Sequence, residues 1–101
     1  MSAFEALADP TRRRIVELVA KRERSAGELA SAFAISRPGV SRHLRVLREE
    51  GIVLAREEGT RRVYSLKPGS LDEVDDWVDR CRRFWTNRLD ALDTELKRGR
   101  R

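Results

Sequence analysis

The arginines of residues 36–48 are the side chains whose types and spacing can carry out recognition chemistry in this chain. Written as a helix, this segment places Arg42 and Arg45 on one side, with Arg37 and Ser41 on the flank. A guanidinium can donate two hydrogen bonds to guanine O6 and N7, or bind phosphate oxygens. Such a helix suits a DNA major groove. Taken by itself, the segment also fits an ordinary surface helix with solvated arginines.

The same segment carries signals that would hold it in place. Ser36 can cap the helix start, Pro38 falls in the first turn where its missing N–H is harmless, and Gly51 ends the helix. A narrow apolar stripe at positions i, i+4 and i+7 would pack against the rest of the domain. Its members are Val40, Leu44 and Leu47.

A second helix is predicted directly before this one. Ser25 and Glu28 have the spacing of a capping box, and residues 34–36 form a tight turn into the arginine-bearing helix. Two short helices joined in this way make a helix-turn-helix, here residues 25–49. The residues of the first helix expected to be buried are Leu29 and Phe33.

After Gly51 the hydrophobic pattern changes to that of strands. Residues 52–56 and 62–66 are predicted to pair around a glycine-bearing tip at residues 57–61. A hairpin after a recognition helix is the wing of a winged helix-turn-helix, here residues 52–66. Its charge is mixed, since two arginines are opposed by two glutamates: Arg61, Arg62, Glu57 and Glu58.

Two helices are predicted at the N-terminus. Residues 2–8 read as a short helix with Phe4 and Leu7 facing inward. Asp9 is the N-cap and Pro10 the first residue of a helix that runs to about residue 22. Its inner face is predicted to carry Ile15, Leu18 and Val19, and its outer face Arg12, Arg13 and Arg14.

A long amphipathic helix is predicted over residues 70–97, capped by Ser70 with Glu73 at capping-box spacing. It exceeds what so small a domain can cover, so the excess is predicted to pack against the same helix of a second chain. Its apolar stripe comprises Val74, Val78, Cys81, Trp85, Leu89, Leu92 and Leu96, widened by Trp77 and Phe84. The fold class is therefore mainly α with a small β-hairpin, a single domain over residues 1–101.

Charge distribution favours a polyanionic partner. The 101 residues carry a net charge of +5, which lies in the first two-thirds and in the tail at residues 97–101. Cys81 is the only cysteine, so no disulfide can form within the chain, which fits a reducing cytoplasm, although one between two chains stays open. No signal peptide or membrane-length apolar run is present, so we expect a soluble, cytoplasmic protein without membrane contact.

The order and wording of these segments resemble the ArsR family of bacterial winged-helix transcriptional regulators. The resemblance covers nearly the whole chain. It rests on residues 6–15, on residues 36–44 with Leu47, and on Glu58-Gly59 with residues 62–64. It implies a homodimeric repressor that binds double-stranded DNA at a palindromic operator. Dimerisation would use residues 1–8 and 70–97, with an interface of Phe4, Leu7, Val78, Cys81, Trp85, Leu89 and Leu92.

The pair Phe84-Trp85, followed by Arg88-Leu89 and Leu92, resembles a subgroup of the family without metal ligands, and the family's metal-sensing motifs are absent here. Residues 25–29, where relatives place cysteines, hold no thiol, and the last helix has no histidine. We therefore predict no metal and no cofactor. An unidentified small-molecule or protein inducer and a constitutive repressor without an inducer both stay open. No catalytic constellation is visible, so no enzyme is predicted. The aromatic residues of the last helix fit a dimer core better than an effector pocket.

The predicted DNA contacts comprise one helix face and the wing. His43 is included as a phosphate contact or packing residue, since one histidine cannot build a zinc site. Cys81 is interpreted as a buried residue at the dimer seam, with a redox sensor as the alternative. The other functional hypotheses are a protein-interaction module and a ligand-gated or redox-gated form of the repressor. The predicted DNA-binding residues are Ser36, Arg37, Ser41, Arg42, His43, Arg45, Arg61 and Arg62.

Overall fold

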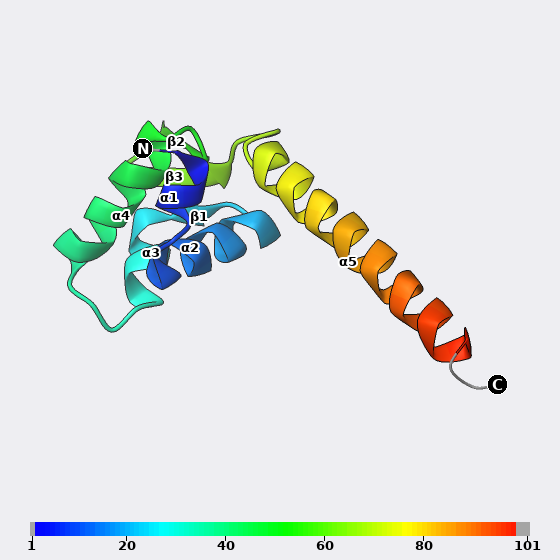
Figure 1. Cartoon of the computed structure of the whole chain (residues 1–101). Coiled ribbons are helices and arrows are strands. Elements are labelled where there is room, and N and C mark those ends of the chain that lie inside the picture. Colours follow the sequence, from blue (N-terminus) through cyan, green and yellow to red (C-terminus); the bar gives the residue numbers. More distant parts are fainter. Residues whose placement is uncertain (1, 99–101) are drawn as a thin grey trace. The chain divides into compact units, whose positions relative to one another are not determined.

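The computed structural model describes residues 2–98, and Figure 1 shows its elements. Met1 and the end of the predicted basic tail, residues 99–101, lie outside the described residues. The chain forms two compact units, which meet in sequence between Leu71 and Asp72. The first unit contains α1 (Ala3–Ala6), α2 (Pro10–Lys21), β1 (Arg24–Ser25), α3 (Ala26–Ser31), α4 (Arg37–Glu49), β2 (Val53–Glu58) and β3 (Arg61–Leu66), and the second consists of α5 (Asp72–Arg98).

The prediction of a mainly helical fold with a winged helix-turn-helix is confirmed, and the sheet has one strand more than predicted. The strand order is β1-β3-β2 and all pairs are antiparallel. The hairpin is longer than expected, because Glu58 pairs with Arg61 and the tip is only Gly59 and Thr60. Gly59 has a φ of 64°, which a glycine adopts without strain. In β1, Arg24 pairs with Tyr64, which is distant in sequence. A strand of two residues is too short to be predicted from a sequence pattern.

The core of the first unit lies between α2, α4 and the sheet. Ile15 and Val19 are buried as predicted, whereas Leu18 is half-buried and Val16 takes the third buried position of α2. The prediction that Arg12 lies on the outer face is wrong. Its Nε donates a hydrogen bond of 2.5 Å to the Ala6 carbonyl, so the side chain folds back over the end of α1 and is half-buried.

The first helix of the helix-turn-helix has the predicted capping box. Ser25 Oγ accepts from the Glu28 backbone N–H at 3.1 Å, and Glu28 Oε1 accepts from the Ser25 backbone N–H at 3.3 Å. Leu29 is buried, but Phe33 lies beyond the helix end and is half-buried. Because α3 ends at Ser31, its connection to α4 spans residues 32–36 and is longer than the predicted three-residue turn.

The second unit is a single helix of 27 residues. It begins at Asp72 rather than at Ser70, so the predicted cap is wrong: Ser70 Oγ is buried and has no hydrogen-bond partner among the described residues. Three acidic residues fill its first turn, where the positive end of the helix dipole favours them. None of the helices over residues 2–98 combines the length and the hydrophobicity that a membrane span requires.

Asp9 provides a direct test of how the first unit is held together. Its Oδ1 accepts from the backbone N–H groups of Thr11 at 2.8 Å and Arg12 at 3.1 Å, which makes it the N-cap of α2. We expect Asp9→Ala to lower the free energy of unfolding by about 1 kcal/mol, because both N–H groups lose their acceptor. Chemical denaturation measures this difference. Asp9→Asn, which keeps an acceptor oxygen, is the matched control and should retain most of the stability.

The same residue predicts a pH dependence. The hydrogen bond from the Arg12 backbone N–H is the main cause that lowers the pKa of Asp9. A carboxylate with a lowered pKa in the folded state contributes stability above its ordinary pKa and loses it as the pH falls through the folded-state value. The difference in unfolding free energy between the wild type and Asp9→Ala should therefore shrink in acid. A difference that stays constant from neutral to acidic pH would contradict this assignment.

Candidate nucleic-acid interface

Helix α4 is fixed by its apolar edge and by its first turn. Val40, Leu44 and Leu47 are buried, with at most 3% of each residue exposed, as the spacing predicted. Ser36 Oγ accepts from the Gly39 backbone N–H at 3.2 Å and caps the helix. Gly51 has a φ of 70° and follows the last turn, as predicted. One face of the helix is thereby packed into the core, and the opposite face is exposed.

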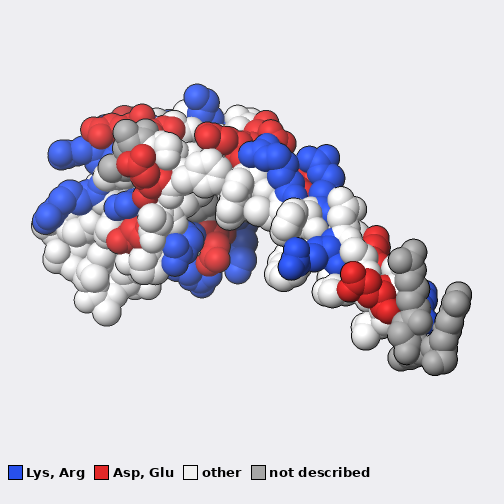
Figure 2. Space-filling view, viewed as in Figure 1, with Lys and Arg blue, Asp and Glu red and all other residues white. Residues whose placement is uncertain are grey.

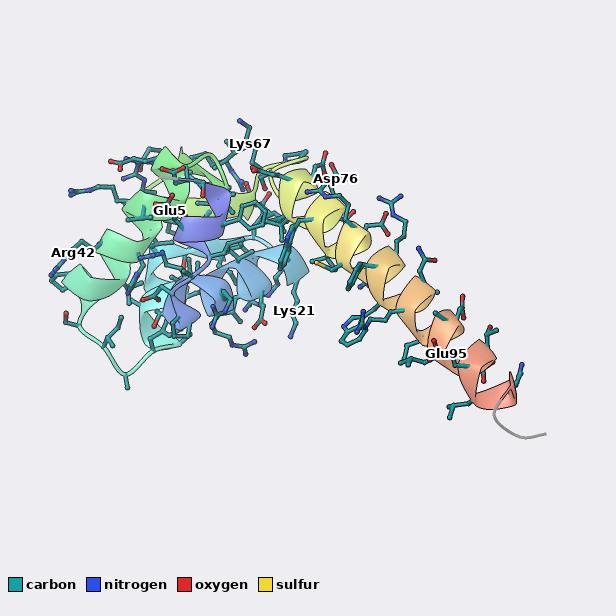
Figure 3. All side chains as sticks on the ribbon, viewed as in Figure 1. Glu5, Lys21, Arg42, Lys67, Asp76 and Glu95 are labelled. Atoms are coloured by element: carbon teal, nitrogen blue, oxygen red, sulfur yellow. The ribbon has the colours of Figure 1, made fainter. Side chains whose placement is uncertain are left out.

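The free face of α4 is rich in arginine. Ser36 and Ser41 are exposed beside it. Figure 2 shows basic side chains over the α4 end of the first unit, and in Figure 3 the Arg42 side chain points outward from that helix. None of these arginines forms an ion pair with another residue in the described range 2–98, so their charges are available to an outside anion. The exposed arginines are Arg37, Arg42, Arg45 and Arg48.

A concave surface runs from α4 to the wing and the start of α3. A cleft of about 440 Å³ brings Arg37 together with Arg61 and Arg62 of β3. A neighbouring cleft of about 290 Å³ is lined by Arg45 and Arg48, again with Arg62. Both clefts have Ala26 of α3 in their walls, so small residues there leave room between the basic groups. The surface can hold anionic groups at several points along one path.

The wing arginines differ from those of α4 because each is paired with a carboxylate. Arg61 Nη2 lies 3.4 Å from Glu28 Oε1, and Arg62 Nε lies 3.8 Å from Glu57 Oε1. The Arg62 guanidinium also lies over the Tyr64 ring, 5.9 Å from its centroid. The mixed charge that the sequence predicted for the wing therefore takes the form of specific ion pairs.

His43 lies apart from the other predicted DNA contacts. It is half-buried and faces α2: its Nδ1 lies 3.4 Å from Arg12 Nη1 and 4.0 Å from Asp9 Oδ1. Its position links the start of α2 to the middle of α4. Among residues 2–98, no three side chains of His, Cys, Asp or Glu gather at a spacing that would hold a metal ion.

The residues predicted for the dimer interface fall into two groups. Phe4 on α1 and Leu7 directly after it are half-buried, and Leu7 packs against the core of the first unit. On α5, Val78 is half-buried and Cys81 is an exposed free thiol in the single chain. The remaining predicted residues are exposed to 61%, 58% and 48%: Trp85, Leu89 and Leu92.

Residues outside the predicted set also line this concave surface, and two of them, Arg48 and Thr60, lie close to predicted arginines in the sequence. Arg48 follows Arg45 by three positions and so lies on the same helix face, a spacing that was visible in the sequence. Thr60 sits at the wing tip beside Arg61 and Arg62. Its position could not be read from the sequence, because it depends on how the hairpin closes.

Comparisons with known proteins agree on one family. Residues 9–54 match the model of the bacterial regulatory protein, arsR family. The HTH-type transcriptional regulator Rv2034 of Mycobacterium tuberculosis is 48% identical over 86% of this chain and 78% of its own length. The transcriptional repressor SdpR of Bacillus subtilis is 34% identical over 76% of this chain and 86% of its own length.

A solved structure extends the agreement to the fold. The crystal structure of a possible transcriptional regulator for arsenical resistance has a TM-score of 0.74 and 39% identity, and the match covers 94% of this chain and 96% of that one. The exposed arginines of α4, the wing beside them and these relatives lead to the same conclusion. The chain belongs to the ArsR family of DNA-binding transcriptional regulators.

Proposed function

We propose that this protein is a homodimeric repressor that binds a palindromic operator in cytoplasmic DNA. Helix α4 enters the major groove, where Arg42 and Arg45 contact base edges and Arg37 contacts the flanking backbone. In the wing, Arg61 and Arg62 contact phosphates of the DNA backbone. The observation that carries the proposal is the outward face of α4, whose arginines have no intramolecular ion pair within the described chain while the opposite edge is buried.

The geometry favours groove binding over general attraction to anions. Arg42 and Arg45 are three positions apart on a helix whose backbone is fixed by three buried side chains. Because the helix is already folded and held, its backbone loses little conformational freedom on binding, and the positions from which the two arginines reach the bases are set. Ser36 and Ser41 lie at the margin of the same face, where hydroxyl groups can donate to phosphate oxygens.

The proposed dimer follows from α5 and from the symmetry of an operator. The exposed apolar residues of α5 recur every three or four residues along its 27 residues, which suits packing against a second helix. Two copies of α4 would then read half-sites about 34–36 Å apart in successive major grooves. We include α1 in the interface because Phe4 and Leu7 are only half-buried in the single chain.

The first test removes the two central arginines. We expect Arg42→Ala and Arg45→Ala each to weaken operator binding by about 1–3 kcal/mol, and to reduce the preference for the operator over scrambled DNA. Footprinting on the DNA upstream of its own gene locates the operator, and fluorescence anisotropy measures the affinities. Arg14→Ala is the matched control, since Arg14 is exposed on α2 and paired with Glu17. Unchanged operator affinity in both variants would contradict the proposed orientation of α4 toward DNA.

The second test addresses the dimer. Leu89→Glu introduces a charge into the apolar stripe of α5 and should convert the dimer to a monomer, because burying an unpaired carboxylate is strongly unfavourable. Sedimentation equilibrium gives the molecular mass. Asn87→Glu places the same charge on the opposite side of the helix and should leave the dimer intact. Dimerisation that survives Leu89→Glu, or a wild type that is monomeric, would refute this role of α5.

A further inference from the structure

The arginines that line the concave surface fall into two groups, which differ in whether a carboxylate of the same molecule pairs with them. Those of α4 form no ion pair with any other described residue, whereas those of the wing are held by carboxylates of the same molecule. Both sets line the same clefts, and both are exposed. A DNA phosphate reaching the wing therefore meets guanidinium groups that already have a partner.

Glu28 is the centre of the more elaborate of these contacts. One oxygen, Oε1, accepts from the Ser25 backbone N–H and lies 3.4 Å from Arg61 Nη2. The other oxygen, Oε2, lies 3.0 Å from Arg22 Nη2. A single carboxylate thus caps α3 and joins the end of α2 to the wing. The capping hydrogen bonds fix the position of the Glu28 carboxylate, which therefore faces Arg61 at the edge of the cleft that Arg61 lines.

We propose that Glu28 and Glu57 are internal competitors of DNA, which occupy Arg61 and Arg62 in the free protein and give way to backbone phosphates when the wing binds. The inference rests on the proposed DNA-binding function and assigns a role to two acidic residues within it. Glu28 and Glu57 are positioning residues, because they act on DNA through the arginines that they hold.

The contacts are suited to exchange. The Arg61–Glu28 pair is long, and its side chains are 61% and 38% exposed, so water and salt weaken it. When Arg61 leaves, Glu28 keeps Arg22 and the Ser25 N–H as partners and is not left as an isolated charge. Arg37 lines the same cleft as Arg61, so a phosphate bound there gains two guanidinium groups while the protein gives up one weak contact.

The exchange predicts two changes in DNA binding, in affinity and in salt dependence, that a purely structural role of Glu28 does not predict. A phosphate contact carries no sequence information, so removing the competitor should strengthen binding to operator and random DNA by the same factor. It should also steepen the salt dependence, because the freed arginine associates with anions from solution and releases them on binding. A residue that only stabilises α3 would change neither quantity in this direction.

The experiment measures binding of the full-length protein to an operator duplex and to a random-sequence duplex by fluorescence anisotropy at several salt concentrations. We expect Glu28→Gln to bind both duplexes about two- to five-fold more tightly, with a slope of log affinity against log salt steeper by up to about one. Glutamine can still complete the capping box, so the fold is preserved. Glu57→Gln, at an exposed strand position with no capping role, should act in the same direction through Arg62.

Two controls separate local exchange from a general change of charge. Glu17→Gln removes the same charge from an exposed ion pair with Arg14 on α2, and its effect on affinity sets the baseline. In an Arg61→Ala background, Glu28→Gln should give no gain beyond that baseline, since the competitor has nothing left to hold. This double variant also tests whether the gain comes from a freed Arg22.

The outcomes are distinct. Glutamine variants that match Glu17→Gln, a gain that persists without Arg61, or weaker binding by Glu28→Gln would each overturn the exchange while leaving DNA binding in place. A wild type that binds neither duplex would instead refute the proposed function itself. Thermal denaturation of each variant verifies that the fold is retained, and Glu57→Gln decides the question if Glu28→Gln unfolds.

Discussion

Burial of one edge of α4 is the constraint on which the proposed DNA-binding surface depends. Val40, Leu44 and Leu47 together remove an apolar stripe from water, each contributing roughly 1.5–3 kcal/mol. Because a helix repeats every 3.6 residues, committing these positions to the core forces Arg42 and Arg45 to the outside. The cap at Ser36 and the glycine at position 51 set where the helix begins and ends, so the register of the arginines is fixed along its length as well.

The distribution of carboxylates then divides the basic surface into parts with different tasks. No described carboxylate pairs with the α4 arginines, so the long-range attraction for DNA acts there without internal competition. The wing carries opposing charges in direct contact, which lowers its attraction for anions at a distance. Under the proposed exchange, its arginines act only on a phosphate close enough to replace Glu28 or Glu57, the carboxylates that pair with them. In the proposed mode of binding, α4 determines the approach to DNA, and the wing responds once the helix is in place.

Local signals in the sequence predicted the helices of the DNA-binding unit well. The cap at Asp9, the capping box at Ser25 and the bounds of α4 each depend on residues within a few positions of one another, and all are found as predicted. Features that depend on distant contacts were missed. β1 exists only because Arg24 meets Tyr64 across the sheet. The side chain of Arg12 was missed for a different reason, because its hydrogen bond to the Ala6 carbonyl depends on how the chain turns between α1 and α2.

The candidate site shows the same division. The outward direction of Arg42 and Arg45 followed from helical periodicity, because it needs only the position of the buried edge. The pairing of Arg61 with Glu28 joins residues 33 positions apart and depends on the sheet that brings β3 beside the start of α3. His43 lies on the same helix as the arginines, yet its orientation is decided by Arg12 and Asp9 on α2. Helical periodicity alone thus specifies which residues face outward. Which of the charged residues around them form ion pairs depends on the assembled fold.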